Sequence, residues 1–154
     1  MRKLDIAYYG VQLAAENLNF PVPEVYIIQE SKLVNKGITG FYSFKNNEIT
    51  FNEDWINRSQ EIEVVITAFH EARHAYQGYC VNKNTYENEE TISKWREEFT
   101  NYLSPSGENN EHDDVEYLNQ AIEVDAIRYT HLQIYKLFGV KTEVPEVIRN
   151  LISI

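Results

Sequence analysis

Apolar residues recur at helical spacing near the amino terminus of this chain. Between residues 3 and 19 they occupy one face of a helix with about 3.6 residues per turn. These positions are Leu4, Ala7, Tyr8, Val11, Ala14, Ala15 and Leu18. Pro21 and Pro23 follow, and proline ends helices because it lacks the amide proton that a helix interior needs. The pattern therefore predicts a first helix over residues 3–19.

Short segments rich in β-branched and aromatic residues come next. Residues 25–28 read Val-Tyr-Ile-Ile, and segments 41–44 and 48–51 alternate on either side of the pair Asn46-Asn47. Alternation around an Asn-rich turn is typical of a β-hairpin. We therefore predict one strand at 25–28, followed by a hairpin.

A longer helix is predicted after the hairpin, running to about Tyr79. Asn57 or Ser59 can cap its start, because their side chains accept a hydrogen bond from a free amide of the first turn. Glu61 and Glu63 then fall in that first turn, where the helix dipole favours acidic side chains.

The rest of the chain also has a mainly helical pattern. We predict a polar helix over about 87–102, a hydrophilic loop over 108–114, and a long helix over 115–138 that Gly139 ends. A last short helix is predicted after Pro145.

Length and charge narrow the class of protein. A chain of 154 residues is long enough for one hydrophobic core and short for two, and no repeat or linker interrupts it, so we predict a single α+β domain over residues 1–154. The net charge is −10, with 24 acidic against 14 basic residues and no basic cluster, which disfavours direct nucleic-acid binding. The balance favours divalent cations or basic segments of a partner protein, although an acidic solvated surface explains it equally well.

The single cysteine, Cys80, excludes an internal disulfide framework and a Cys-rich zinc site. The amino terminus lacks the apolar core of a secretion signal, and no window is apolar over the length that a bilayer requires. We therefore expect a cytoplasmic protein without a membrane partner.

The predicted long helix contains the sequence His70-Glu71-Ala72-Arg73-His74. Residues four apart lie on the same face of a helix, so His70 and His74 can direct imidazole nitrogens at one point, as two ligands of a tetrahedral zinc must. Glu71 lies about 100° around the helix, beside the metal, where it can accept a proton from a water molecule. The alternative is a pair of surface histidines that fall four apart by chance.

A catalytic zinc needs a third protein ligand. We predict Glu123, because a carboxylate on a mostly apolar helix face is costly to bury unless it is paired or bound to a metal. A solvated carboxylate at the helix edge is the alternative. Asp125 is the rival ligand, but it points about 200° away from Glu123. His131 and His112 are read as an ordinary helix histidine and a solvated loop histidine.

The segments FHEARHAYQ, starting at Phe69, and YLNQAIEVDAIRY, starting at Tyr117, resemble the gluzincin arrangement of small zincin-fold metallopeptidases. The likeness is to ImmA/IrrE-like peptidases of phages and mobile elements, and it covers roughly residues 25–80 and 115–135. The resemblance implies a zincin-like α+β fold with an N-terminal helix, a small and mostly antiparallel sheet with a hairpin, the motif helix and C-terminal helices. It also implies that Glu123, in the context Glu-Val-Asp-Ala, is the third zinc ligand.

Two departures from the family pattern stand out. Many gluzincins carry an aspartate four residues after the ligand glutamate, where it hydrogen-bonds a zinc-bound imidazole, but this chain has Ile127 there. That role then falls to Asp125 or to a backbone carbonyl. The stretch between His74 and Glu123 also contains an extra predicted helix, which leaves the shape of the substrate cleft open.

Several other residues have two readings. Arg73 can pair with an acid or bind a substrate carboxylate. Tyr76, Tyr129 and Tyr135 can donate to an oxyanion, but core packing is the simpler role for each. Cys80 is read as a small packed residue. If the family likeness holds, the strand 48–51 can pair with an extended peptide.

The sequence thus predicts a metalloendopeptidase with Zn²⁺ held by His70, His74 and Glu123, Glu71 as general base, and a protein or peptide substrate such as a repressor. One alternative is a catalytically silent, zinc-stabilised protein-binding or regulatory module. Another is a metal-free helical protein whose acidic face docks a basic partner.

Overall fold

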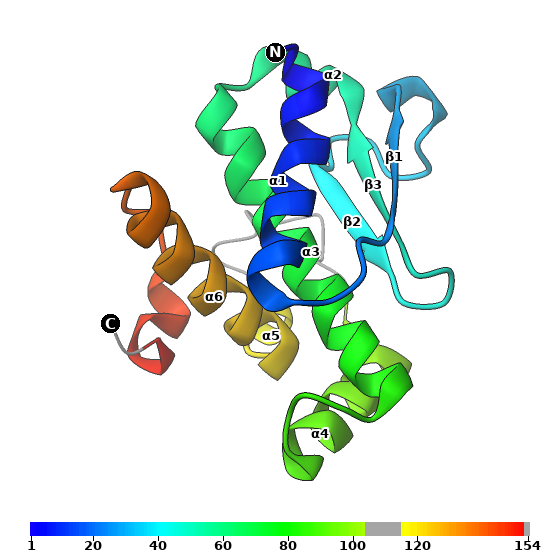
Figure 1. Cartoon of the computed structure of the whole chain (residues 1–154), viewed down its shortest axis with the longest axis vertical. Helices are drawn as coiled ribbons and strands as arrows, with labels where there is room; N and C mark the ends of the chain where they lie inside the picture. The colour runs from blue at the N-terminus through cyan, green and yellow to red at the C-terminus, as the bar shows by residue number, and fades with distance from the viewer. Residues whose placement is uncertain (104–114, 153–154) are drawn as a thin grey trace. The chain divides into compact units, whose positions relative to one another are not determined.

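The computed structural model describes residues 1–103 and 115–152 (Figure 1). The chain divides into two compact units, Met1–Tyr79 and Cys80–Ile154. The predicted loop 108–114 lies outside the described residues, and the single domain over 1–154 stays a prediction. The described part combines helices with a three-stranded sheet, which agrees with the α+β class. The finer zincin-like assignment stays a prediction.

The first unit contains α1 (Lys3–Leu18), a sheet, and most of the long helix α3. The strands are β1 (Glu24–Ile28), β2 (Gly40–Ser43) and β3 (Glu48–Asn52), with the short η1 (Glu30–Lys32) after β1. A short helix, α2 (Glu53–Arg58), separates β3 from α3 (Glu61–Lys83). The predicted first helix, strand and hairpin are therefore confirmed, and α3 continues one turn beyond Tyr79.

The sheet is mixed, with strand order β1-β3-β2. β2 and β3 form the predicted antiparallel hairpin, whereas β1 runs parallel to β3, with Val25 opposite Ile49 and Ile27 opposite Phe51. The expectation of a mostly antiparallel sheet is thus wrong for one of the two pairings. The reason is topological: β2 runs opposite to β3, and the chain also reverses direction between β1 and β2, so β1 and β3 point the same way.

Helices α1 and α3 lie side by side at one side of the sheet (Figure 1). Their contact is unusually close, because a Cβ built on Gly10 would come within 2.7 Å of the Cβ of Ala68. Ala7, Val11 and Ala14 on α1 are fully buried. Small residues at this crossing let the backbones approach, which seats the helix that carries the histidine motif.

The predicted cap of the motif helix is wrong. Asn57 lies inside α2, and the hydroxyl of Ser59 donates to the carbonyl of Trp55 at 2.6 Å, closing the end of α2. The cap of α2 is Asn52, whose side-chain oxygen accepts from the amide of Trp55 at 3.2 Å. The hairpin strand therefore passes directly into a short helix, Glu53–Arg58, that the sequence pattern did not predict.

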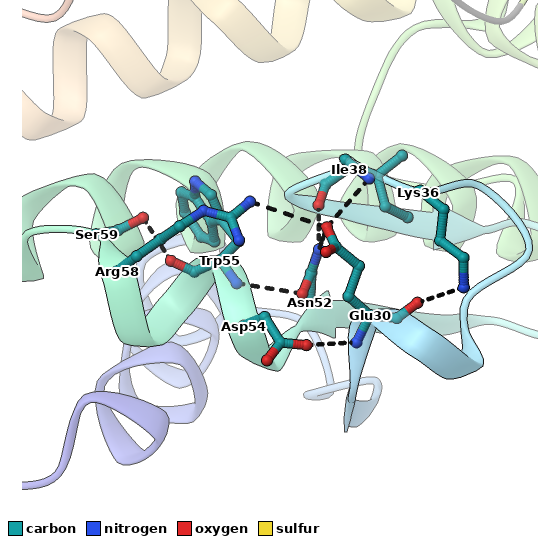
Figure 2. A network of polar contacts seen from close by, with 9 residues as sticks. Glu30, Lys36, Ile38, Asn52, Asp54, Trp55, Arg58 and Ser59 are labelled. Carbon is teal, nitrogen blue, oxygen red and sulfur yellow. Dashed lines mark hydrogen bonds and ion pairs between the residues drawn. The ribbon is translucent and has the colours of Figure 1, made fainter.

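Asn52 is the centre of a polar network that joins β3, η1 and α2 (Figure 2). Its side-chain nitrogen donates to the carbonyl of Ile38 at 2.9 Å and to the carboxylate of Glu30 at 3.1 Å. Asp54 accepts from the amide of Glu30 at 2.7 Å, and Lys36 donates to the carbonyl of Glu30 at 2.8 Å. A fully buried amide with three partners holds the end of the sheet against the following helix.

We expect Asn52→Ala to lower the free energy of unfolding by about 2–4 kcal/mol, because it removes a helix cap and leaves buried polar groups without their partner. Urea unfolding followed by circular dichroism measures this change. Asn57→Ala, at an exposed position of α2, is the matched control, with an expected change within about 0.5 kcal/mol. Equal stability of the two variants would contradict the structural role of Asn52.

The second unit is helical in its described part. It contains α4 (Glu89–Thr100), α5 (Val115–Leu118), α6 (Ala121–Phe138) and the 3-10 helix η3 (Glu146–Leu151). Gly139 ends α6 in the left-handed conformation, with φ 69°, as predicted. A small core in this unit packs Leu118 of α5 against Val144, Ile148 and Ile152 of the carboxyl-terminal segment.

The predicted long helix over 115–138 is in fact broken into α5 and α6. The carboxylate of Glu98 on α4 accepts from the amides of Ala121 and Ile122 at 2.9 and 2.8 Å. Those amides would bond to carbonyls of the preceding turn if the helix were continuous. A distant acidic side chain therefore defines where α6 begins.

Candidate metal centre

The motif helix brings two imidazoles together. His70 and His74 lie one turn apart on α3, and their Nε2 atoms are 3.2 Å apart. The rings meet edge to face, with centroids 4.8 Å apart. His74 is only 6% exposed and His70 is half-buried. Both rings therefore direct the same nitrogen at one point, as their spacing predicted.

Gln77 determines which nitrogen of His74 can bind a metal. Its side-chain oxygen lies 2.9 Å from Nδ1 of His74, and Gln77 is fully buried on the next turn of α3. An amide oxygen only accepts hydrogen bonds, so Nδ1 carries the proton and Nε2 keeps its lone pair. Such a partner behind a metal-binding histidine orients the ring. The partner of Nδ1 of His74 in the structure is Gln77. A role for Asp125 or a backbone carbonyl behind a metal-binding histidine stays a prediction.

The spacing of the two nitrogens fits zinc. Two ligands at about 2.0–2.1 Å from a tetrahedral zinc are about 3.3–3.4 Å apart, close to the 3.2 Å between the two Nε2 atoms. The same separation also suits a hydrogen bond between the rings. Neutral imidazole nitrogens are ligands that zinc prefers, so both the distance and the chemistry of this pair fit the cation.

Glu123 lies in the first turn of α6 and is fully buried. The hydroxyl of Tyr102 donates to its Oε2 at 3.0 Å. Among the described residues, His70, His74 and Glu123 form a group that can hold a metal ion, with one ligand atom from each within 4.8 Å of the others. The alternative reading of Glu123 as a solvated helix-edge carboxylate is wrong.

The rival ligands are placed differently. Asp125 is half-buried and does not belong to this group of possible ligands. His131 is buried, and its Nδ1 lies 2.8 Å from the hydroxyl of Thr142, which agrees with the reading of an ordinary helix histidine. His112 lies outside the described residues.

Glu71 is 8% exposed and lies on α3 beside the histidines. A carboxylate at this depth is shielded from bulk solvent, which strengthens its electrostatic interactions with groups nearby. Its role as general base stays a prediction, but its position and burial are compatible with it.

The structure gives the burial and contacts of the other residues for which the sequence allowed two roles. Tyr76 is buried and meets the ring of Phe20 edge to face at 5.7 Å, so core packing holds for it. The guanidinium of Arg73 lies over the Tyr76 ring, 4.6 Å from its centroid. Tyr129 and Cys80 are buried as well, whereas Tyr135 is 53% exposed.

The expectation that strand 48–51 pairs with a peptide is wrong. This strand is β3, which already has β1 on one side and β2 on the other. In the described part of the chain, the outer strands of the sheet are β1 and β2, and any added strand must pair with one of them.

Tyr42 of β2 connects the hairpin to the motif helix. Its hydroxyl donates to the side-chain oxygen of Asn47 at 3.0 Å and occupies the space that a side chain at Gly78 would need. Gly78 follows His74 by one turn on the same face of α3. Burial raises the pKa of the Tyr42 phenol well above its usual value, so it stays a hydrogen-bond donor at physiological pH.

Sequence reasoning missed two residues of the site, Gln77 and Tyr102. Gln77 follows His74 by three positions, a spacing that brings helical side chains together, so a local signal existed. Tyr102 lies 21 residues before Glu123, and no sequence pattern links the two.

Comparison of the chain with protein-family models, curated proteins and solved structures gave no match. Across the described residues, no helix combines the length and apolar character that crossing a membrane requires.

Proposed function

We propose that the chain is a zinc-dependent peptidase in which His70, His74 and Glu123 hold the metal and Glu71 is the general base. The observation that carries the proposal is the 3.2 Å separation of the two Nε2 atoms. Because Gln77 accepts from Nδ1 of His74, that ring presents a lone pair at Nε2. The burial of Glu123 adds the carboxylate that a catalytic zinc site of this type requires.

Each group of the proposed site has its own role in hydrolysis of a peptide bond. Zinc, when bound, polarises a carbonyl group and makes a water molecule more acidic. Glu71 accepts a proton from the attacking water and delivers it to the leaving amine. Gln77 holds the ring of His74 in its binding orientation. The likeness of the motif segments to ImmA/IrrE-like peptidases supports a protein or peptide substrate, and a cytoplasmic location goes with the same proposal.

We expect the purified chain to bind about one zinc ion and to melt at a higher temperature when zinc is present. A ligand at about 1,000 times its dissociation constant stabilises the folded state by about 4 kcal/mol. Metal analysis and thermal unfolding, before and after chelation, measure both effects. Mg²⁺ is the control, because it prefers oxygen ligands and should give no such increase. An unchanged melting temperature with zinc would contradict the proposal and favour a metal-free interaction protein.

A further inference from the structure

The structure assigns a positioning role to Tyr102: we propose that its hydroxyl orients the carboxylate of Glu123 for metal binding. The inference rests on the proposed function, since it concerns a ligand of that metal. It adds a residue that lies outside both motif segments.

The hydrogen bond between the two side chains has a defined direction. The phenol of Tyr102 donates to Oε2 of Glu123 at 3.0 Å. Because Glu123 is fully buried, water does not compete for this oxygen. A carboxylate with one oxygen held by a hydroxyl cannot rotate freely, so its other oxygen keeps a fixed direction. Partners of this kind orient metal ligands and raise the affinity for the ion.

Tyr102 is 42% exposed, so its inward hydroxyl needs a structural explanation. Gln120 supplies it, through two hydrogen bonds to the backbone of Leu103. Its side-chain oxygen accepts from the Leu103 amide at 2.9 Å, and its side-chain nitrogen donates to the Leu103 carbonyl at 2.9 Å. The ring of Tyr102 also packs edge to face on Tyr117, with centroids 6.2 Å apart.

The other partner is equally well fixed. Glu98 accepts from the first two amides of α6, at Ala121 and Ile122, and Glu123 lies in the same turn. Gln120 immediately precedes that turn, so the residue that holds the Tyr102 segment also adjoins the helix start. Hydrogen bonds therefore join the segment over residues 101–103 to the start of α6. These contacts hold the hydroxyl of Tyr102 against the buried carboxylate of Glu123.

The test is zinc affinity in the full chain, measured by competition with a chromophoric chelator. We expect Tyr102→Phe to bind zinc about 10- to 100-fold more weakly than the parent. Tyr135→Phe, which removes an exposed hydroxyl from the same helix that carries Glu123, should bind like the parent. The absorption spectrum of bound Co²⁺ should change in Tyr102→Phe and stay unchanged in the control. The metal-free Tyr102→Phe should still unfold cooperatively, at a somewhat lower temperature than the parent, because the buried Oε2 of Glu123 loses its donor.

A second variant tests the connection to Gln120. We expect Gln120→Leu to weaken zinc binding as well, and the double variant with Tyr102→Phe to be no weaker than the more affected single variant, because both act through one hydrogen bond. Parent-like zinc affinity and Co²⁺ spectrum in Tyr102→Phe would overturn the inference, as would a loss of stability without loss of affinity. The proposed function fails separately, if the parent itself binds no zinc.

Discussion

Replacing either motif histidine by alanine is expected to abolish stoichiometric zinc binding. Each of His70 and His74 contributes one imidazole nitrogen to a pair only 3.2 Å apart, and neither can substitute for the other. Zinc sites with four protein ligands bind with about 10–16 kcal/mol, or about 3 kcal/mol per ligand, so one lost ligand weakens binding at least about 100-fold. Metal analysis after dialysis should find about one zinc in the parent and almost none in either variant.

The matched control is His131→Ala. His131 is also a buried helix histidine, but its contact is with Thr142, so its replacement should leave the zinc content unchanged. Circular dichroism of each variant establishes that the helices are intact. If His70→Ala and His74→Ala keep as much zinc as the parent, the metal centre is elsewhere and the proposed function is wrong.

The second large effect is expected for Glu71→Gln, which should keep zinc and lose cleavage. The amide has nearly the shape of the carboxylate but cannot accept a proton at neutral pH, so the rate should fall by about 10²- to 10⁴-fold. A fluorescently labelled unfolded protein is a suitable substrate, because it offers many peptide bonds. Glu61→Gln, an exposed position at the start of the same helix, should cleave like the parent.

The outcomes of this experiment separate the enzyme from its main alternative. Cleavage by Glu71→Gln at the parent rate would contradict a general base at this position. A parent that holds one zinc and cleaves nothing would instead favour the catalytically silent, zinc-stabilised binding module. Zinc content must therefore be measured on the same preparations as activity.

Local patterns predicted the elements, and non-local contacts decided the features that were missed. The apolar positions of α1 and the alternation around Asn46-Asn47 depend on near neighbours, and both elements formed as expected. The parallel pairing of β1 with β3 depends on the path of the chain between them. The break before α6 depends on Glu98, which is 23 residues away from Ala121. No periodicity contains that information.

In the candidate site, too, local spacing predicted some residues and non-local contacts determined the others. His70 and His74 could be paired from their spacing, because one helix fixes their geometry. Glu123 was selected by its apolar surroundings and by resemblance, and its complete burial agrees with the first of these arguments. Tyr102 could not be selected, since its link to Glu123 requires the chain to return to the start of α6. The identity of the metal stays a prediction.

The choice of Gln77 behind His74 has a consequence for how strongly the cation is retained. The partner is an amide, whereas many gluzincins have an aspartate behind a ligand histidine. A negatively charged partner draws the Nδ1 proton toward itself and makes the imidazole a stronger electron donor. A neutral amide orients the ring equally well but adds less electron density. A metal ion held by this histidine would therefore keep more of its own positive charge, and it would exchange more readily with free metal ions in solution.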